Sequence, residues 1–140
     1  MTQPPAASPA MLLVLLGRRL RTRMDDALRE QGLSLRHLSA LGHLAGLPGL
    51  SYSELARRAG ITVQSMQSTL AQLEALDAIE RRSEPGRGRT AELHVTPAGE
   101  ALLAKGRDIV RAADEALLSA LGEDEGALTM MLLRGLRAVD

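Results

Sequence analysis

Apolar residues recur at helical spacing along most of the chain. Between residues 10 and 33, Leu or Met returns at every fourth position, which predicts one long amphipathic helix. The stretches Ile79–Glu84 and Ala91–Val95 instead alternate apolar and polar residues, and the glycine-rich loop between them predicts a β-hairpin. Further helices are predicted from Leu35 to the turn at Gly46, from Ser51 to Gly60, from Val63 to about Leu76, from Pro97 to about Leu121 (with Leu102, Ile109, Ala113 and Leu117 inward), and after Gly122. The pattern predicts a mostly α protein with one small β-hairpin.

Short motifs mark where the middle helices begin and end. The run Ser51-Tyr52-Ser53-Glu54 has the form of a capping box at the start of a helix. Within Leu55–Ile61, Ala56 is small where two helices cross, and Gly60 suits the left-handed turn between them. These features predict a helix-turn-helix, which the hairpin extends to a winged helix-turn-helix over residues 34–96. A plain helical hairpin with a glycine turn is the alternative.

The two ends of the chain are too apolar for the surface of a monomer. Residues 11–16 are apolar on every side of their helix, and the last helix carries Leu128, Leu132 and Leu136 on one stripe. A second chain is the simplest cover for such surfaces. We therefore expect residues 10–33 and 97–140 to form dimerisation helices, and residues 1–9, with three prolines, to form a flexible tail.

The composition narrows the class of partner. The 140 residues are 45% hydrophobic but include one Tyr and no Phe or Trp, which suits a helical protein and disfavours binding of single-stranded nucleic acid by base stacking. The absence of Cys excludes disulfides and thiolate zinc sites. No apolar run is long enough to span a bilayer, and the first nine residues lack the positive charge of a secretory signal. We expect a soluble, cytoplasmic protein with no membrane partner and no cofactor.

The helix after Gly60 has an outer face that is polar but uncharged. From Thr62 it carries short hydroxyl and amide side chains, with no charged residue before Glu74. Gln can pair with adenine edges, and Ser and Thr can bond to bases or phosphates. Arginines on a glycine-rich loop can enter the minor groove, and an arginine beside the turn can bind a phosphate. We expect DNA contacts from Arg57, Thr62, Gln64, Ser65, Gln67, Ser68, Arg87 and Arg89. A solvated helix face and a solubilising turn are the alternatives.

Net charge alone does not select DNA as the partner. The chain has 17 basic and 17 acidic residues, and residues 51–95 hold six Arg against six acids. A basic surface must therefore come from the arrangement of these residues. The same balance supports an alternative function, a winged-helix module that binds protein without binding DNA.

Four stretches carry the pattern of a known family. They are Gly32-Leu33-Ser34, Leu55–Ile61, Leu73–Arg81 and Leu93–Gly99. In their order and spacing along the chain, these stretches resemble the MarR family of bacterial regulators, and the resemblance extends from Leu12 to Val139. The resemblance implies a sequence-specific DNA-binding transcriptional regulator, a homodimer joined by its terminal helices. It also implies that each winged module binds half of a pseudo-palindromic operator, and that a small ligand releases the repressor from DNA.

Three positions depart from the family pattern. Arg87 stands where the wing usually has Asp, while Arg89 keeps the wing Arg, so the pair that braces the wing is missing. Ser68 stands where the recognition helix often has Arg, so base preference should differ. Asp77 replaces the Gly that usually ends that helix, and Asp can accept a left-handed conformation.

The resemblance also implies a ligand between the dimerisation helices and the DNA module, often a small aromatic acid. Arg18, Arg19 and His37 are the candidate ligand residues, because a cation that faces inward can meet a carboxylate. A solvated helix face is the alternative. His37 and His43 do not share a helical face, so no metal site is expected. No constellation of acid, base and nucleophile is present, so an enzyme, such as a small hydrolase, is not expected.

Overall fold

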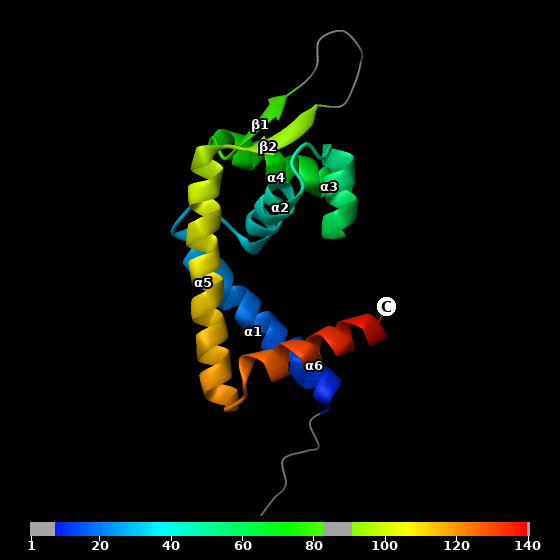
Figure 1. The fold of residues 1–140 in the computed structure, drawn as a ribbon, viewed down its shortest axis with the longest axis vertical. Helices are drawn as coiled ribbons and strands as arrows, with labels where there is room; N and C mark the ends of the chain where they lie inside the picture. The colour runs from blue at the N-terminus through cyan, green and yellow to red at the C-terminus, as the bar shows by residue number, and fades with distance from the viewer. Residues whose placement is uncertain (1–7, 83–90, 140) are drawn as a thin grey trace, which may run out of the picture.

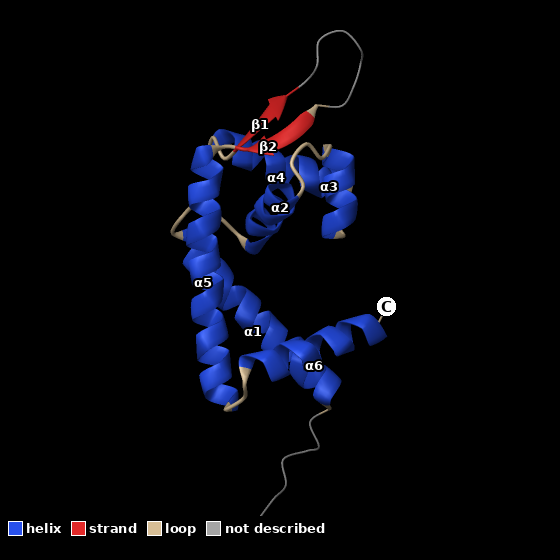
Figure 2. Ribbon diagram, in the orientation of Figure 1, coloured by secondary structure: helices blue, strands red, loops and turns tan. Residues whose placement is uncertain are grey.

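The protein is mostly helical, with one two-stranded hairpin (Figures 1 and 2). The computed structural model describes residues 8–82 and 91–139. In chain order the elements are α1 (Pro9–Arg29), α2 (Leu35–Gly46), α3 (Tyr52–Ala59), α4 (Val63–Ala75), β1 (Ile79–Arg82), β2 (Glu92–Val95), α5 (Pro97–Leu121) and α6 (Glu125–Ala138). The predicted order of elements is confirmed. None of the helices in these ranges is long and apolar enough to cross a membrane.

Helix α5 joins two ends of an elongated molecule. In Figure 1 it runs along one side, with α2, α3, α4 and the hairpin gathered at its beginning and α6 folded back from its end. Helix α1 packs against α5 and α2, and α2 also contacts α3, α4 and β2. We call the region of α2, α3, α4, β1 and β2 the compact end, and the region of α6 and the first half of α1 the open end.

The buried core lies in the compact end. Its fully buried side chains come chiefly from α2, α3 and α4, and α1 contributes only Leu28, close to its last turn. Full burial of a Leu side chain stabilises a fold by about 1.5–3 kcal/mol. In contrast, no described residue of α6 is buried. The compact end therefore has a core of its own, whereas the open end lacks one within a single chain.

A left-handed residue ends helix α4. The φ of Asp77 is +55°, in the region that Gly usually occupies. Next to it, the Ala78 N–H donates to the Leu73 carbonyl at 2.9 Å, which closes the helix. The Asp77 carbonyl in turn accepts a hydrogen bond from the Thr96 hydroxyl, just before α5. The prediction that Asp77 tolerates this conformation is confirmed.

The hairpin is antiparallel, with Ile79 opposite Val95 and Arg82 opposite Glu92. The loop between α2 and α3 adds to its edge, because the Leu93 N–H donates to the Leu50 carbonyl at 3.0 Å. The two strands lie within the stretches predicted from alternation. The connecting residues 83–90, which include Arg87 and Arg89, lie outside the described residues.

The inward face of α5 agrees with the prediction in part, because Leu102, Ile109, Ala113 and Leu117 are all half-buried. The fully buried leucine of this helix, however, is Leu103. Gly99 and Gly106 lie buried on the same face. Leu102 and Ile109 pack against the core, as predicted, and the pattern missed the two glycines because glycine has no apolar side chain.

The two buried glycines let α5 approach its neighbours closely. A Cβ at Gly99 would lie 2.0 Å from the carbonyl oxygen of Ala78. A Cβ at Gly106 would lie 2.3 Å from the Cδ1 of Leu38 on α2. Both distances are far below van der Waals contact, so the start of α5 is fixed against β1 and α2 by the absence of side chains.

Candidate nucleic-acid interface and ligand cavity

Helices α3 and α4 form a helix-turn-helix whose turn is set by local residues. At the start of α3, the Ser51 hydroxyl accepts from the Glu54 N–H at 3.2 Å, and the Glu54 carboxylate accepts from the Ser51 N–H at 3.3 Å. At its end, Gly60 has a φ of +69°. Ala56 is fully buried where the two helices cross. The predicted capping box and the left-handed turn at Gly60 are both confirmed.

Helix α4 has a buried face and an exposed polar face. Met66, Thr69, Leu70 and Leu73 are buried. Gln64, Gln67 and Ser68 lie on the exposed side of the helix. The buried face orients α4, and this leaves three uncharged hydrogen-bonding side chains directed away from the core.

Two of the polar residues at the start of α4 already serve the helix itself. The Thr62 hydroxyl caps α4 by accepting from the Ser65 N–H at 3.0 Å. Ser65 is half-buried, and its carbonyl accepts from the Thr69 hydroxyl at 3.0 Å. Thr62 and Ser65 therefore fix the N-terminus of α4, where free backbone N–H groups favour an anion such as a phosphate.

The arginines around α4 fall into two groups. Arg57 and Arg58 are exposed at the end of α3, and neither forms an ion pair with a described residue. Arg81 pairs with Glu74 of α4 at 2.6 Å, and Arg82 pairs with Glu80 at 2.6 Å. The cations of α3 are therefore available to a phosphate, whereas those of β1 are partly neutralised.

The pKa of the Glu54 carboxyl is lowered by its neighbours in α3 and its cap, above all by Ser51. Hydrogen bonds from the Ser51 hydroxyl and backbone N–H, together with the charges of Arg57 and Arg58, hold the pKa of the Glu54 carboxyl below its ordinary value. Glu54 is thus a carboxylate at neutral pH and stabilises the first turn of α3.

A cavity of about 330 Å³ lies between α1, α2 and the turn from α3 to α4. Its wall combines two guanidinium groups with apolar side chains, and its lining is Arg21, Leu35, Arg36, Ser39, Ala59, Ile61 and Met66. A planar apolar molecule with one negative charge fits this chemistry, because its ring can contact Ile61 and Met66 while its anion meets an arginine.

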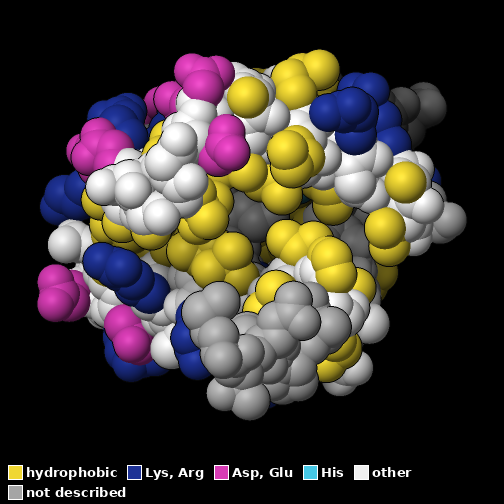
Figure 3. Space-filling model, turned by 90° about the horizontal axis from the view of Figure 1, so that it is seen from below, with side chains coloured by type: hydrophobic (Ala, Val, Ile, Leu, Met, Phe, Trp, Pro, Cys, Tyr) yellow, Lys and Arg dark blue, Asp and Glu magenta, His cyan; other side chains and the backbone are white. Residues whose placement is uncertain are grey.

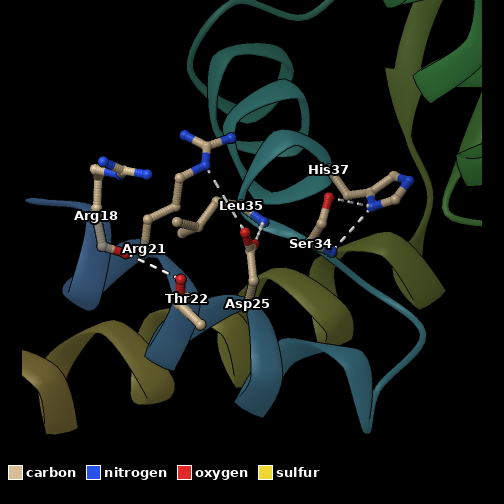
Figure 4. Close-up of polar contacts among 7 residues, drawn as sticks. All are labelled: Arg18, Arg21, Thr22, Asp25, Ser34, Leu35 and His37. Carbon is tan, nitrogen blue, oxygen red and sulfur yellow. Dashed lines mark hydrogen bonds and ion pairs between the residues drawn. The ribbon is translucent and has the colours of Figure 1, made fainter.

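Figure 4 shows how Arg21 reaches the first turn of α2. The Arg21 Nε lies 3.8 Å from one carboxylate oxygen of Asp25, and the other oxygen accepts from the Leu35 N–H at 2.7 Å. Asp25 thus caps α2 from α1. At 3.8 Å its pairing with Arg21 is loose compared with the 2.6 Å pairing of Arg81 and Glu74.

The three ligand residues suggested by the sequence lie outside this cavity. Arg18 and Arg19 are exposed on α1, beside a shallow depression that they share with Thr22 and Arg23. His37 bonds instead to Ser34 and Gln72. Arg36 was not identified from the sequence as a candidate ligand residue. Its place beside the cavity depends on the tertiary packing of α2 against α3 and α4. The ligand role of Arg18, Arg19 and His37 stays a prediction.

The chain is similar in sequence to known transcriptional repressors. The model of the MarR family matches residues 31–90. The HTH-type transcriptional repressor Rv2887 of Mycobacterium tuberculosis is 38% identical over 110 residues, which are 79% of each chain. The chain belongs to the MarR family. The resemblance predicted from the sequence is thereby confirmed.

Solved MarR-family structures share the fold. A Mycobacterium tuberculosis Rv2887 structure in complex with DNA has a TM-score of 0.77 and 33% identity, covering 93% of this chain and 98% of that chain. The same protein in complex with salicylic acid has a TM-score of 0.69 and 33% identity, covering 96% and 97%. Reduced MarR from E. coli, at 16% identity, shows the fold alone, with a TM-score of 0.80 and coverage of 95% and 98%. The winged helix-turn-helix class is confirmed.

This MarR-family chain exposes apolar side chains at its open end. Met130 and Leu136 of α6 are 58% and 69% exposed, and Leu13 of α1 is 55% exposed. Figure 3, viewed from below, shows hydrophobic side chains gathered around a hollow in this surface. Exposed apolar surface of this extent marks a site of association.

Proposed function

We propose that this MarR-family protein is a transcriptional repressor that binds specific duplex DNA as a homodimer and releases it when an aromatic acid occupies the cavity. The observation that carries the proposal is the exposed, uncharged face of α4, which the buried Met66, Leu70 and Leu73 direct outward. Binding, and not catalysis, is the activity that the residues support.

Each residue of the interface has a distinct role in this proposal. Gln64, Gln67 and Ser68 contact base edges in the major groove. The capped N-terminus of α4, with Thr62 and Ser65, sits against a phosphate. Arg57 binds a flanking phosphate, and Arg87 and Arg89, which lie outside the described residues, enter the minor groove.

The homodimer is proposed from the open end. The exposed apolar residues of α1 and α6 lie at the same end of the molecule (Figure 1), although they are far apart in sequence. A second copy can cover them by a two-fold contact, which would also place two α4 helices in successive major grooves. Residues 10–33 and 97–140 are thus proposed as the dimerisation helices, and residues 34–96 as the DNA-binding region.

The effector is proposed from the cavity and from a relative. Structures of Rv2887 contain salicylic acid or p-aminosalicylic acid. We infer that an aromatic carboxylate binds here with its anion at Arg21 or Arg36 and its ring against Ile61 and Met66. Since the cavity separates α1 and α2 from the α3–α4 turn, a ligand that fits only one spacing of these walls shifts the position of α4.

DNA binding is tested by enrichment of sequences from a random duplex pool with the wild-type protein, followed by fluorescence anisotropy on the enriched 30-base-pair duplex. We expect affinity for the enriched duplex to exceed that for a scrambled duplex by at least about 10³-fold, and to fall as salt rises. If the protein enriches no sequence, the DNA-binding function is wrong.

The effector site is tested with salicylate and two matched arginine variants. We expect salicylate to weaken binding of the enriched duplex, and Arg36→Gln to reduce the ratio of the dissociation constants measured with and without salicylate. Arg18→Gln, on the exposed face of α1, should keep the wild-type ratio. The opposite result for the two variants would move the ligand from the cavity to the α1 depression.

A second candidate function is supported by the balance of charge. Residues 51–95 contain six Arg and six acids, and Arg81 and Arg82 are paired with carboxylates. A winged module with this charge can bind protein. Failure to bind any duplex at low salt, with the dimer intact, would favour this function over DNA binding.

A further inference from the structure

One directional contact joins helix α4 to helix α2. The Nε2 of His37 lies 2.5 Å from the amide oxygen of Gln72, although the two residues are 35 positions apart. Gln72 lies on the exposed side of α4, whereas the buried face of this helix is mostly apolar. The buried apolar face sets which side of α4 turns outward, but its contacts are less directional than a hydrogen bond and leave room for small rotations of the helix about its axis. The contact of His37 with Gln72 adds a directional restraint on that rotation.

The ring of His37 is held from its other side as well (Figure 4). Its Nδ1 accepts from the Ser34 backbone N–H at 2.9 Å and lies 2.9 Å from the Ser34 hydroxyl. A ring nitrogen that accepts from an N–H carries no proton, so the neutral ring has its proton on Nε2 and donates it to Gln72. Both ring nitrogens of His37 are therefore hydrogen-bonded, Nδ1 at the N-terminus of α2 and Nε2 to α4, and His37 bridges the two helices.

Gln72 is well placed to control the exposed face of α4. It follows Ser68 by one turn and Gln64 by two turns, so a rotation of the helix at Gln72 also moves both of these side chains. On another side of α4, Glu74 accepts from Arg81 of β1 at 2.6 Å. The last turns of α4 are thus held by two polar side-chain contacts, one to α2 and one to β1. Hydrogen bonds to base edges need a fixed helix orientation, because they weaken when the donor–acceptor distance changes by a few tenths of an ångström.

We propose that His37 and Gln72 are positioning residues for sequence readout: their hydrogen bond fixes the rotation of α4 so that its exposed face meets the base edges. The proposal rests on the DNA-binding function proposed above. It assigns His37 a role other than ligand contact, and it directs Gln72 toward α2 instead of toward DNA. Because Leu35 and Arg36 line the cavity from the same turn of α2, the bridge also joins the cavity wall to α4.

The test measures the specificity ratio, which is the dissociation constant for a scrambled duplex divided by that for the enriched duplex. Gln72→Ala removes the bond and leaves the His37 contact with Ser34 in place. His37→Asn keeps an acceptor for the start of α2 but is too short to reach Gln72. Gln72→Glu keeps an acceptor for the His37 Nε2–H, and its added charge affects both duplexes alike, so the ratio cancels that effect.

We expect Gln72→Ala and His37→Asn each to lower the specificity ratio by about threefold to tenfold, the size of one net hydrogen bond. The double variant should lose no more than either single variant, because both remove the same bond. Gln72→Glu should stay within about twofold of wild type. Thermal melting of Gln72→Ala should change little, which separates positioning from a role in folding.

An unchanged ratio in Gln72→Ala, or additive losses in the double variant, would overturn the positioning role. A loss of melting temperature in Gln72→Ala with the ratio intact would overturn it in favour of a purely structural bond. If wild-type protein enriches no duplex, the DNA-binding function fails first and the positioning role fails with it. These results are distinguishable, because the last appears before any variant is measured.

Discussion

Substitution of Gly99 by Ala should destabilise the protein more than the same substitution at Gly106, the other described glycine that is buried in α5. Gly99 lies in the first turn of α5, where a Cβ would be 2.0 Å from the Ala78 carbonyl oxygen and 2.8 Å from the Cγ1 of Val95. The Ala78 oxygen is backbone and already accepts from the Thr96 N–H at 3.0 Å. It therefore cannot move aside without loosening the junction between the hairpin and α5.

The magnitude follows from these distances. Ordinary van der Waals contact begins at 3.4 Å, so α5 and β1 must separate by more than 1 Å at this point. Overpacking of this kind costs about 1–3 kcal/mol, and loss of the Thr96 hydrogen bond adds about 0.5–1.5 kcal/mol. Ala has a higher helix propensity than Gly, which offsets at most about 1 kcal/mol of this loss in stability. A net loss of about 1–3 kcal/mol corresponds to a melting temperature lower by about 3–10 °C for a chain of this size.

The assay is thermal unfolding followed by circular dichroism, at one fixed protein concentration because dimers melt at a concentration-dependent temperature. Two matched glycines serve as controls. Gly106→Ala meets the Leu38 side chain, which can rotate away, so its loss should be smaller. Gly42→Ala, in α2 and outside the proposed dimerisation helices, meets no atom within 4 Å and should melt at or above the wild-type temperature. A melting temperature for Gly99→Ala within about 2 °C of wild type would refute the steric reasoning.

Four further outcomes are expected. The folded-state pKa of Glu54 is lowered from its ordinary value of 4.5, so the carboxylate stabilises the fold fully above pH 4.5 and loses this contribution as the pH falls through the lower pKa. Glu54→Gln should therefore reduce the melting temperature at pH 7 but not at pH 2. An equal reduction at both pH values would contradict this. Arg57→Ala should lessen the slope of log affinity against log salt by about 0.9, and an unchanged slope would remove it from the phosphate contacts. Gln64→Ala should cost about 1–3 kcal/mol on the enriched duplex alone, as measured by anisotropy. Leu132→Glu should give a monomer in sedimentation velocity at micromolar concentration, and a persistent dimer would place α6 outside the interface.

Local signals in the sequence predicted the helix-turn-helix well. The capping box at Ser51 and Glu54 and the turn at Gly60 depend on residues within four positions of one another, so their chemistry is readable without a fold. Asp77 was predictable for the same reason, since short polar side chains tolerate the left-handed region. The burial of Gly99 and Gly106 on α5 was not predictable, because a hydrophobic pattern does not register a residue without a side chain.

The candidate site was predictable only in part. The polar face of α4 follows from helical periodicity, because every fourth residue shares a face. The sequence does not tell which arginines are paired, and the neutralisation of Arg81 by Glu74 depends on how β1 returns past α4. The bridge from His37 to Gln72 and the place of Arg36 in the cavity wall likewise depend on tertiary packing, which no spacing rule encodes.

The packing of α1 against α5 has a consequence for how the protein is made. Helix α1 ends at Arg29 and its partner α5 ends at Leu121, so the two meet only after roughly 90 further residues have been synthesised. At about 5–20 residues per second, the ribosome needs about 5–20 s for that distance. The segments of the compact end emerge in between and can fold on their own core, whereas the apolar residues 11–16 remain uncovered throughout. The nascent chain therefore exposes one apolar helix to chaperones and to the neighbouring nascent chains of the same polysome, which are copies of itself.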